Sequence, residues 1–218
     1  MGFVEESLES ESSNAVFNSW KAKNCQPNYW LNVQPDHTKT CGPYEPSDVI
    51  NPIREENYFE IVNENNHDTI GTVSVDDQLN IAGSCTTNGL IHKIPGRVAD
   101  SSIPGSGTYA ENTVGACAAT GDGDIMMRFS PSFYCVSLMR AGASPGDAAK
   151  MAINRIFEYY PGFTGAVIAV DSKENYGAAC AGMTTFPYSY RKTGMDAALV
   201  QRVSCENVKN MNKSTGIK

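Results

Sequence analysis

The run HDTIGTVSV, residues 67–75, decides how the chain folds, because the character of the sequence changes at Thr69. Ile70, Val73 and Val75 belong to the β-branched class that favours strands. Leu79 and Ile81 resume the apolar pattern after a polar stretch at residues 76–78, which predicts a second short strand joined to the first by a turn. We therefore expect ordered β structure to begin at Thr69.

The residues ahead of this run predict a helix followed by a long irregular segment. Val4, Leu8, Val16 and Trp20 recur at helical spacing, so a surface helix with one buried stripe is expected from residue 4 to about residue 22. Between residues 24 and 66, prolines stand among many Asn, Asp and Glu residues, a composition that favours loop over packed elements. We expect a flexible, cleavable segment that ends at residue 68.

The second half of the chain predicts two helices. Residues 96–123 are dense in Gly, Ser and Thr, and Ser130 with Pro131 then begins a helix that runs to Arg140 and stops at Gly142. A capping sequence at residues 144–147 begins a further helix. The apolar face of that second helix carries Ala149, Ala152, Ile153, Ile156 and Tyr160.

Three strands are expected after these helices. Residues 165–171 and 176–183 predict an antiparallel hairpin, and residues 186–191 predict a third strand. Strands, then helices, then strands indicate an α+β fold in which helices pack on the outside of antiparallel sheets, rather than a parallel βαβ winding.

The overall composition limits the classes of function. At 218 residues with 41% hydrophobic content, the chain can bury a sizeable core as one domain or a tightly joined pair. The net charge of -7 and the scattered distribution of the 17 Lys and Arg residues argue against a nucleic-acid partner or an anionic membrane surface. No apolar run approaches the roughly 18 residues that a membrane span needs.

Seven cysteines are an odd number, so at least one is unpaired or shared with another chain. Cys25 and Cys41 bracket a loop that suits a disulfide, and Cys180 and Cys205 could join the C-terminal tail to a strand. Cys85, Cys117 and Cys135 lie in apolar stretches and are expected to be buried thiols. Paired cysteines favour a secreted or lumenal compartment. Residues 1–15 are acidic and form no secretory leader, which suggests that the front of the protein is absent.

Several common functional motifs are absent from the sequence. Each of Gly105–Gly107 and Gly121–Gly123 supplies a GxG, but neither has the strand, helix and full spacing of a dinucleotide site, and no GxxxxGK[ST] occurs. The sequence has no HExxH or CxxC, and its three histidines are dispersed, so no metal site is expected. A Ser/His/Asp triad on a GxSxG turn is likewise unsupported.

Five ordered motifs instead resemble the glycosylasparaginase family of N-terminal nucleophile hydrolases. They are HDTIG at 67–71, CTTNG at 85–89, GRVAD at 96–100, IPGSGTYAEN at 103–112 and AATGDGD at 118–124. The resemblance extends from MGF at residue 1 through NCQPNYW at 24–30 and CGPY at 41–44 to YGAAC at 176–180. It implies a four-layer αββα sandwich, incomplete at the N-terminus. Residues 1–68 would be the C-terminal portion of an alpha subunit, and residues 69–218 the beta subunit.

The resemblance implies that Thr69 is a nucleophile exposed when the precursor cuts itself between Asp68 and Thr69. The hydroxyl of an N-terminal threonine attacks, and its own α-amine serves as the base. Arg97 resembles the group that grips the substrate α-carboxylate, and Asp100 the partner of the substrate α-ammonium. Thr120 with the Gly121 amide resembles an oxyanion hole. Thr87 would lie beside the nucleophile, and the remaining expected lining residues are Val98, Ala99, Asp122 and Gly123.

The implied activity is hydrolysis of the bond between N-acetylglucosamine and asparagine in a small glycoasparagine, with neither metal nor organic cofactor. A plant-type asparaginase or isoaspartyl peptidase of the same superfamily and a truncated, non-catalytic homologue are the alternatives. A homodimer of cleaved units and a lysosomal or secreted location are also implied. The sequence departs from the family in lacking the front of the first subunit, with a tryptophan and a serine of the pocket. It also carries Ala149 and Ala169 where relatives would have a disulfide.

Overall fold

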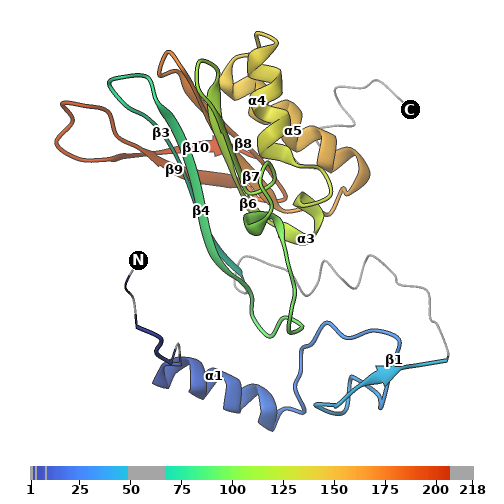
Figure 1. Cartoon of the computed structure of the whole chain (residues 1–218). Coiled ribbons are helices and arrows are strands. Elements are labelled where there is room, and N and C mark those ends of the chain that lie inside the picture. The colour runs from blue at the N-terminus through green and yellow to red at the C-terminus, as the bar shows by residue number, and fades with distance from the viewer. Residues whose placement is uncertain (1, 3, 8, 49–66, 207–218) are drawn as a thin grey trace, which may run out of the picture. The chain divides into compact units, whose positions relative to one another are not determined.

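The computed structural model describes residues 2, 4–7, 9–48 and 67–206, with the backbone alone at residues 67 and 68. Much of the expected cleavable segment, residues 49–66, lies outside the described residues. The chain divides into two compact units (Figure 1). The N-terminal unit comprises residues 1–61 and 92–97, and the C-terminal unit comprises residues 62–91 and 98–218.

The N-terminal unit begins with helix α1, Glu11–Ala22. Ser10 caps the helix: its hydroxyl accepts from Ser13 N, and the Ser13 hydroxyl accepts in turn from Ser10 N. This reciprocal cap fixes the start of the helix well after the expected residue 4. The predicted buried stripe is wrong, because α1 has no buried residue and Val16 is 51% exposed. Helical spacing shows which side chains share a face, but it does not supply a surface that covers them.

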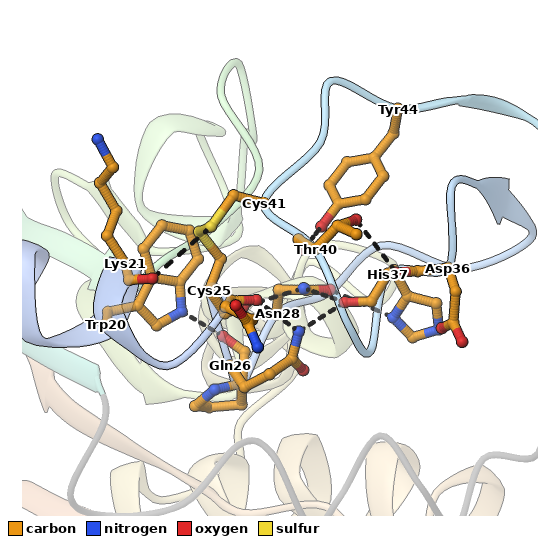
Figure 2. The surroundings of a disulfide bond; sticks show 12 residues. Trp20, Lys21, Cys25, Gln26, Asn28, Asp36, His37, Thr40, Cys41 and Tyr44 are labelled. Carbon is orange, nitrogen blue, oxygen red and sulfur yellow. Dashed lines mark hydrogen bonds between the residues drawn. A yellow bond between two sulfur atoms is a disulfide. The ribbon is translucent and has the colours of Figure 1, made fainter.

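A disulfide between Cys25 and Cys41 closes the loop that follows α1 (Figure 2). The buried Asn28 amide donates to the carbonyl oxygens of Cys25 at 3.0 Å and His37 at 2.8 Å. Two short strands pair antiparallel here, namely β1 (Val33–Gln34) and β2 (Glu45–Pro46). The pairing of the two cysteines is the one that the sequence suggested.

An antiparallel sheet of four strands in the order β5-β6-β7-β8 is the centre of the C-terminal unit. Its strands are β5 (Thr108–Glu111), β6 (Gly115–Gly121), β7 (Gly165–Asp171) and β8 (Tyr176–Ala181). The predicted hairpin of β7 and β8 is confirmed. Strands β5 and β6 were not predicted. Strand β5 is only four residues long, and the small residues of β6 carry little of the β-branched and aromatic signal of strands.

Helices α4 (Pro131–Arg140) and α5 (Pro145–Tyr159) pack against one face of this sheet (Figure 1). Both predicted helices are confirmed, with Pro near each start and Gly142 at a φ of 100° after α4. Serine 144 caps α5 by accepting from Asp147 N at 3.2 Å. Four of the five residues of the predicted apolar face of α5 are confirmed, since Ala149, Ala152, Ile153 and Ile156 are all at most 1% exposed. The fifth, Tyr160, is the half-buried C-cap that follows the helix.

A second antiparallel pair, β3 (His67–Val75) with β4 (Ile81–Leu90), packs against the opposite face of the sheet. Gly71 lies on Ala118 so closely that a Cβ added to the glycine would come 2.8 Å from the alanine Cβ. Asp76 joins the two strands by accepting from Gln78 N at 2.9 Å and Asn80 N at 2.7 Å. The two strands and polar turn predicted from residues 67–81 are therefore confirmed.

The last described elements are strands β9 (Thr185–Tyr190) and β10 (Leu199–Ser204), which pair antiparallel. Strand β9 was predicted and β10 was not. A disulfide joins Cys180 to Cys205, so the residues after β10 are tied to β8, as the sequence suggested.

One expectation about cysteines is corrected. Cys117 on β6 and Cys135 on α4, expected to be buried thiols, form a disulfide that links the sheet to the helix. Both residues are fully buried, and Cys117 is paired in register with Ala169 of β7. The apolar sequence around each cysteine indicates burial, but it does not show that strand β6 and helix α4 pack together. Cys85 is the one free cysteine, and all seven lie in described parts of the chain. Its thiol is free as expected, but the residue is half-buried rather than buried.

The predicted α+β class is confirmed. The described residues form small sheets, three of two strands and one of four, so the four-layer sandwich remains a prediction. No helix among the described residues is long and apolar enough to cross a membrane.

Substituting Gly115 with alanine should destabilise the C-terminal unit. A Cβ at this position would lie 2.3 Å from Val170 O and 3.1 Å from Asp171 Cα, so backbone must move. Overpacking of this kind lowers the free energy of unfolding by about 1–3 kcal/mol. Gly146→Ala is the matched control, because its Cβ meets nothing within 4 Å. Urea unfolding of both variants measures the difference, and equal stabilities would contradict the packing described for β6 and β7.

Candidate active site

Thr69 lies at an irregularity in the β3–β4 pair. Asp68 pairs with Gly89 and Ile70 pairs with Thr86, so Thr87 and Asn88 together face the single residue Thr69. This two-against-one arrangement is a β-bulge, which turns side chains away from the regular ladder. The Thr69 hydroxyl donates to Thr87 Oγ1 at 3.1 Å, and Thr87 Oγ1 also accepts from Gly89 N at 2.8 Å. The structure therefore brings together the expected nucleophile and the expected neighbouring hydroxyl.

Thr120 and Gly121 end strand β6, opposite Ala166 and Gly165 of β7. Gly121 has a φ of 131°, and a Cβ there would lie 2.4 Å from both Gly165 Cα and Thr164 O. No other residue fits this position without moving the β7 backbone. Thr120 is half-buried.

The face of β3 that carries Thr69 meets the face of β6 that carries Thr120. Side chains two residues apart share a face of a strand. Thr69 therefore shares a face with Gly71, and Thr120 shares a face with Ala118, the residue on which Gly71 packs. The opposite face of β6 is occupied by helix α4, through the Cys117–Cys135 disulfide.

Asp100 begins the short 3₁₀ helix η1, Asp100–Ser102, and is 4% exposed. Its carboxylate lies directly against Gly123, because a Cβ on the glycine would come 2.3 Å from Asp100 Oδ1 and 2.9 Å from Ala99 Cβ. Three of the predicted site residues, Ala99, Asp100 and Gly123, thus come together. A larger residue at position 123 would displace the carboxylate.

Asp122 has a structural role that the sequence analysis had not assigned to it. It is the N-cap of helix α3, Gly123–Met126, and its Oδ1 accepts from Asp124 N at 3.1 Å and Ile125 N at 3.3 Å. Its own backbone N–H donates to Thr164 O at 2.9 Å. The buried Asp122 side chain therefore orders the turn that follows the Thr120–Gly121 pair.

Arg97 lies in the N-terminal unit, and its neighbour Val98 begins the next stretch of the C-terminal unit. Arg97 is the last residue of a tight turn: its N–H donates to Ile94 O at 3.1 Å, with Pro95 second and Gly96, at a φ of 87°, third. Proline followed by a glycine with positive φ is typical of a type II turn. Val98 is 55% exposed. Arg97 and Asp100, the two residues predicted to bind the charged groups of the substrate, are therefore close in the sequence but belong to different units.

The sequence analysis did not identify Cys85 as a neighbour of this site. Its thiol donates to Ser101 O at 3.3 Å and lies beside Gly107, where an added Cβ would come within 2.9 Å of Sγ. Burial raises the pKa of this thiol, and the charge of Asp100 adds to the effect. The sequence around a single cysteine gives no signal of a contact with a residue 16 positions away.

The N-terminal unit contains a cavity of 470 Å³ that the sequence analysis also missed. Aromatic side chains line it together with Arg97, from α1, from the disulfide loop and the residues just after it, and from the segment 92–97: Phe17, Trp20, Trp30, Tyr44 and His92. These aromatics stand far apart in the sequence, so no local pattern shows that they meet.

Among the described residues, no group of three or more His, Cys, Asp or Glu side chains could hold a metal ion. The candidate residues of the C-terminal unit offer hydroxyls, backbone amides and the two buried carboxylates of Asp100 and Asp122. Arg97, in the N-terminal unit, offers a guanidinium.

Comparison with known proteins identifies a family. A family model described as asparaginase matches residues 1–200. A Drosophila persimilis protein, provisionally named as an N(4)-(beta-N-acetylglucosaminyl)-L-asparaginase, is 51% identical over 191 residues, covering 86% of this chain and 49% of the relative. A rat protein named N(4)-(beta-N-acetylglucosaminyl)-L-asparaginase is 48% identical over 186 residues, covering 85% of this chain and 53% of the relative. A mouse protein of the same name is 48% identical over 190 residues, with 85% and 54% covered. The chain spans about half the length of these curated relatives.

Cys85 should be the one cysteine per chain that a thiol reagent modifies without prior reduction. Because its pKa is raised, the reactive thiolate should form at higher pH than the usual midpoint near about 8.5. Alkylation rates from pH 6 to 10, followed by mass spectrometry, test this, with Cys85→Ser as the unreactive control. Modification of a second cysteine, or a midpoint below the usual value, would contradict the assignment.

Proposed function

Because the chain belongs to the asparaginase family, we propose that it carries the nucleophile and most of the pocket of an amidohydrolase that cleaves glycoasparagines. The substrate would be an asparagine whose side-chain nitrogen bears N-acetylglucosamine, and the products aspartate and a glycosylamine. The relatives whose names specify this substrate support the proposal. The observation that carries it is the hydrogen bond from the Thr69 hydroxyl to Thr87 at the bulge.

The first reaction would free the nucleophile. Thr69 Oγ1 attacks the carbonyl carbon of Asp68, the C–N bond breaks, and the acyl group moves from nitrogen to oxygen while the proton passes from the hydroxyl to the new amine. Water then hydrolyses the ester, leaving an Asp68 carboxylate and a free Thr69 α-amine. Thr87 Oγ1, already fixed by the Gly89 amide, orients the attacking hydroxyl. Because the hydroxyl already has an oriented partner in the uncut chain, little further ordering precedes attack.

The second reaction would use the freed threonine on the substrate. An α-amine has a pKa of about 7.7–8.0, so near neutral pH an appreciable fraction is unprotonated and can accept the hydroxyl proton. Thr69 Oγ1 attacks the side-chain amide carbon, and the amine returns the proton to the departing glycosylamine. Water then hydrolyses the aspartyl ester on Thr69. The Thr120 hydroxyl and the Gly121 amide would stabilise the tetrahedral oxyanions of both steps.

Recognition of the free amino acid end is assigned to Arg97 and Asp100. The planar guanidinium of Arg97 suits the α-carboxylate, because two parallel N–H groups can donate to its two oxygens. Asp100, buried and held against Gly123, offers a negative charge for the α-ammonium group. We also assign Val98 and Ala99 to the lining of the substrate pocket.

The proposal also includes the expected architecture and setting. We expect the four-layer αββα arrangement, processing into residues 1–68 and 69–218, and a dimer of cleaved units. Three disulfides are typical of proteins that mature in the secretory pathway. A lysosomal location would agree with a role in glycoprotein degradation. A plant-type asparaginase or isoaspartyl peptidase activity on the same residues is the second candidate.

Thr69→Ala should abolish self-cleavage, because the attacking oxygen is removed. Denaturing mass spectrometry of the expressed chain should give two species, residues 1–68 and 69–218, for the unaltered sequence and one uncut chain for the variant. A single uncut species in both would reject the proposed activation for this chain. Release of aspartate from glycosylasparagine rather than from an isoaspartyl dipeptide would decide between the two candidate activities.

Thr120→Val should lower kcat for aspartate release by about 10²–10³-fold, the usual effect of removing one oxyanion donor. The change conserves shape and removes only the hydroxyl. Thr185→Val, at an exposed position of β9, is the matched control and should leave the rate unchanged. Equal rates for the two variants would show that Thr120 is not an oxyanion donor.

A further inference from the structure

The peptide group between Ser106 and Gly107 links helix α4 to the backbone of Asp100. Its carbonyl oxygen accepts from the buried Ser132 hydroxyl at 2.8 Å, and its N–H donates to Asp100 O at 2.9 Å. A peptide group is planar and rigid, so its carbonyl oxygen and its N–H cannot move independently of each other. The position of the Ser132 hydroxyl and that of the Asp100 backbone are therefore connected through one rigid group.

Helix α4 gives this link a fixed end. Ser130 makes no side-chain cap at the helix start, and the Phe133 N–H in the first turn donates instead to Gly105 O at 2.8 Å. A first-turn N–H has no partner within its own helix, so the Gly105 carbonyl serves as the cap. The Cys117–Cys135 disulfide joins the helix to strand β6. The chain just ahead of β5 is therefore attached to a helix that is itself fixed to the central sheet.

The other end of the link holds the start of η1. Asp100 O also accepts from Ile103 N at 2.9 Å, and the Cys85 thiol donates to Ser101 O at 3.3 Å. The backbone here is tightly packed, since a Cβ on Gly107 would come 2.6 Å from Ser101 Cα and 2.9 Å from Asp100 O. A shift of the Asp100 backbone would therefore require the neighbouring peptide group to move with it.

We propose that Ser132 is a positioning residue, which sets the place of the Asp100 carboxylate through the peptide group between Ser106 and Gly107. This inference rests on the proposed function, in which Asp100 binds the α-ammonium group of the substrate. Ser132 itself touches no substrate atom. Its hydroxyl also polarises the peptide group, because a carbonyl oxygen that accepts a hydrogen bond makes the N–H of the same group a better donor. Preference for a free α-amino group would thus depend on a buried serine of α4.

Ser137 of the same helix provides a contrast. The Ser137 hydroxyl donates to Phe133 O at 2.9 Å, four residues earlier in α4, so its contact stays within the helix. The Ser132 hydroxyl bonds outside the helix, and both Ser132 and Ser106 are 0% exposed, so water does not reach this hydrogen bond. Removing the hydroxyl would leave the Ser106 carbonyl buried without this donor, which favours a shift of the peptide group. Ser137 is therefore the matched control.

The Cys85 thiol reports the position of the Asp100 carboxylate without any enzymatic activity. Burial raises the pKa of this thiol and the Asp100 charge raises it further, so a more distant carboxylate lowers the pKa. Alkylation rates of the full chain would be measured between about pH 6 and 10. Ser132→Ala and Asp100→Asn should each lower the pH midpoint of alkylation, and Ser137→Ala should leave it unchanged.

A double-mutant cycle separates positioning from a general loosening of the unit. If Ser132 acts through Asp100, Ser132→Ala should lower the midpoint much less in a chain that already carries Asp100→Asn. Equal shifts in the two backgrounds, or no shift from Ser132→Ala, would overturn the inference. Hydrogen exchange at the Gly107 N–H of the unaltered chain needs no variant. We expect slow exchange there, and exchange as fast as that of a solvent-exposed amide would also overturn the inference.

Substrate hydrolysis tests the consequence for recognition. Ser132→Ala should raise KM for N-acetylglucosaminyl-asparagine about fivefold, the usual effect of weakening one hydrogen-bonded contact, with kcat unchanged. KM for the same compound without its α-amino group should not change, and equal effects on the two compounds would contradict the positioning role. If even the unaltered chain hydrolyses neither compound, the proposed function fails. The Cys85 midpoints would still decide whether Ser132 positions Asp100.

Discussion

The close approach of strand β3 to strand β6 is the constraint on which the candidate site depends. Gly71 lies against Ala118, and an added methyl group would fall 2.8 Å from the alanine Cβ. Two small residues at this crossing bring together the face that carries Thr69 and the face that carries Thr120. On its other side β6 is fixed by the Cys117–Cys135 disulfide to α4. The strand faces that carry Thr69 and Thr120, the proposed nucleophile and the proposed oxyanion donor, can meet because neither strand has a large side chain at the crossing.

Two other glycines of the candidate site, Gly121 and Gly123, also allow close packing. Gly121 accommodates a φ of 131° between Gly165 and Thr164, and Gly123 leaves room for the Asp100 carboxylate. At each position the absence of a side chain leaves room for a neighbouring group: backbone at Gly121 and a carboxylate at Gly123. Residues 96–123 are dense in Gly, Ser and Thr, a composition typical of loops. Part of this stretch instead forms strands β5 and β6, where small residues allow close packing.

Local patterns in the sequence predicted the elements whose signals are local. The caps and apolar faces of α4 and α5 and the turn at Asp76 are confirmed, as is the asparaginase family relationship that the ordered motifs indicated. Contacts between distant residues could not be predicted in this way. The Cys117–Cys135 disulfide, the contact of Cys85 with Ser101 and the aromatic cavity each join segments whose meeting depends on the whole fold. The resemblance supplied roles for single residues, and packing showed that Asp122 also caps a helix.

The placement of residues 92–97 has a consequence for a chain cut after residue 68. These six residues would belong covalently to the later fragment, yet they pack within the unit formed by residues 1–61, where His92 stacks on Trp20. Cutting the backbone would therefore not free the two fragments from each other, since one keeps a short loop embedded in the other. Dissociation would require that loop to be withdrawn, and the arginine at its end would lose its surroundings at the same moment. Retention of the earlier fragment and the ligand recognition proposed for Arg97 would thus depend on the same contacts of residues 92–97.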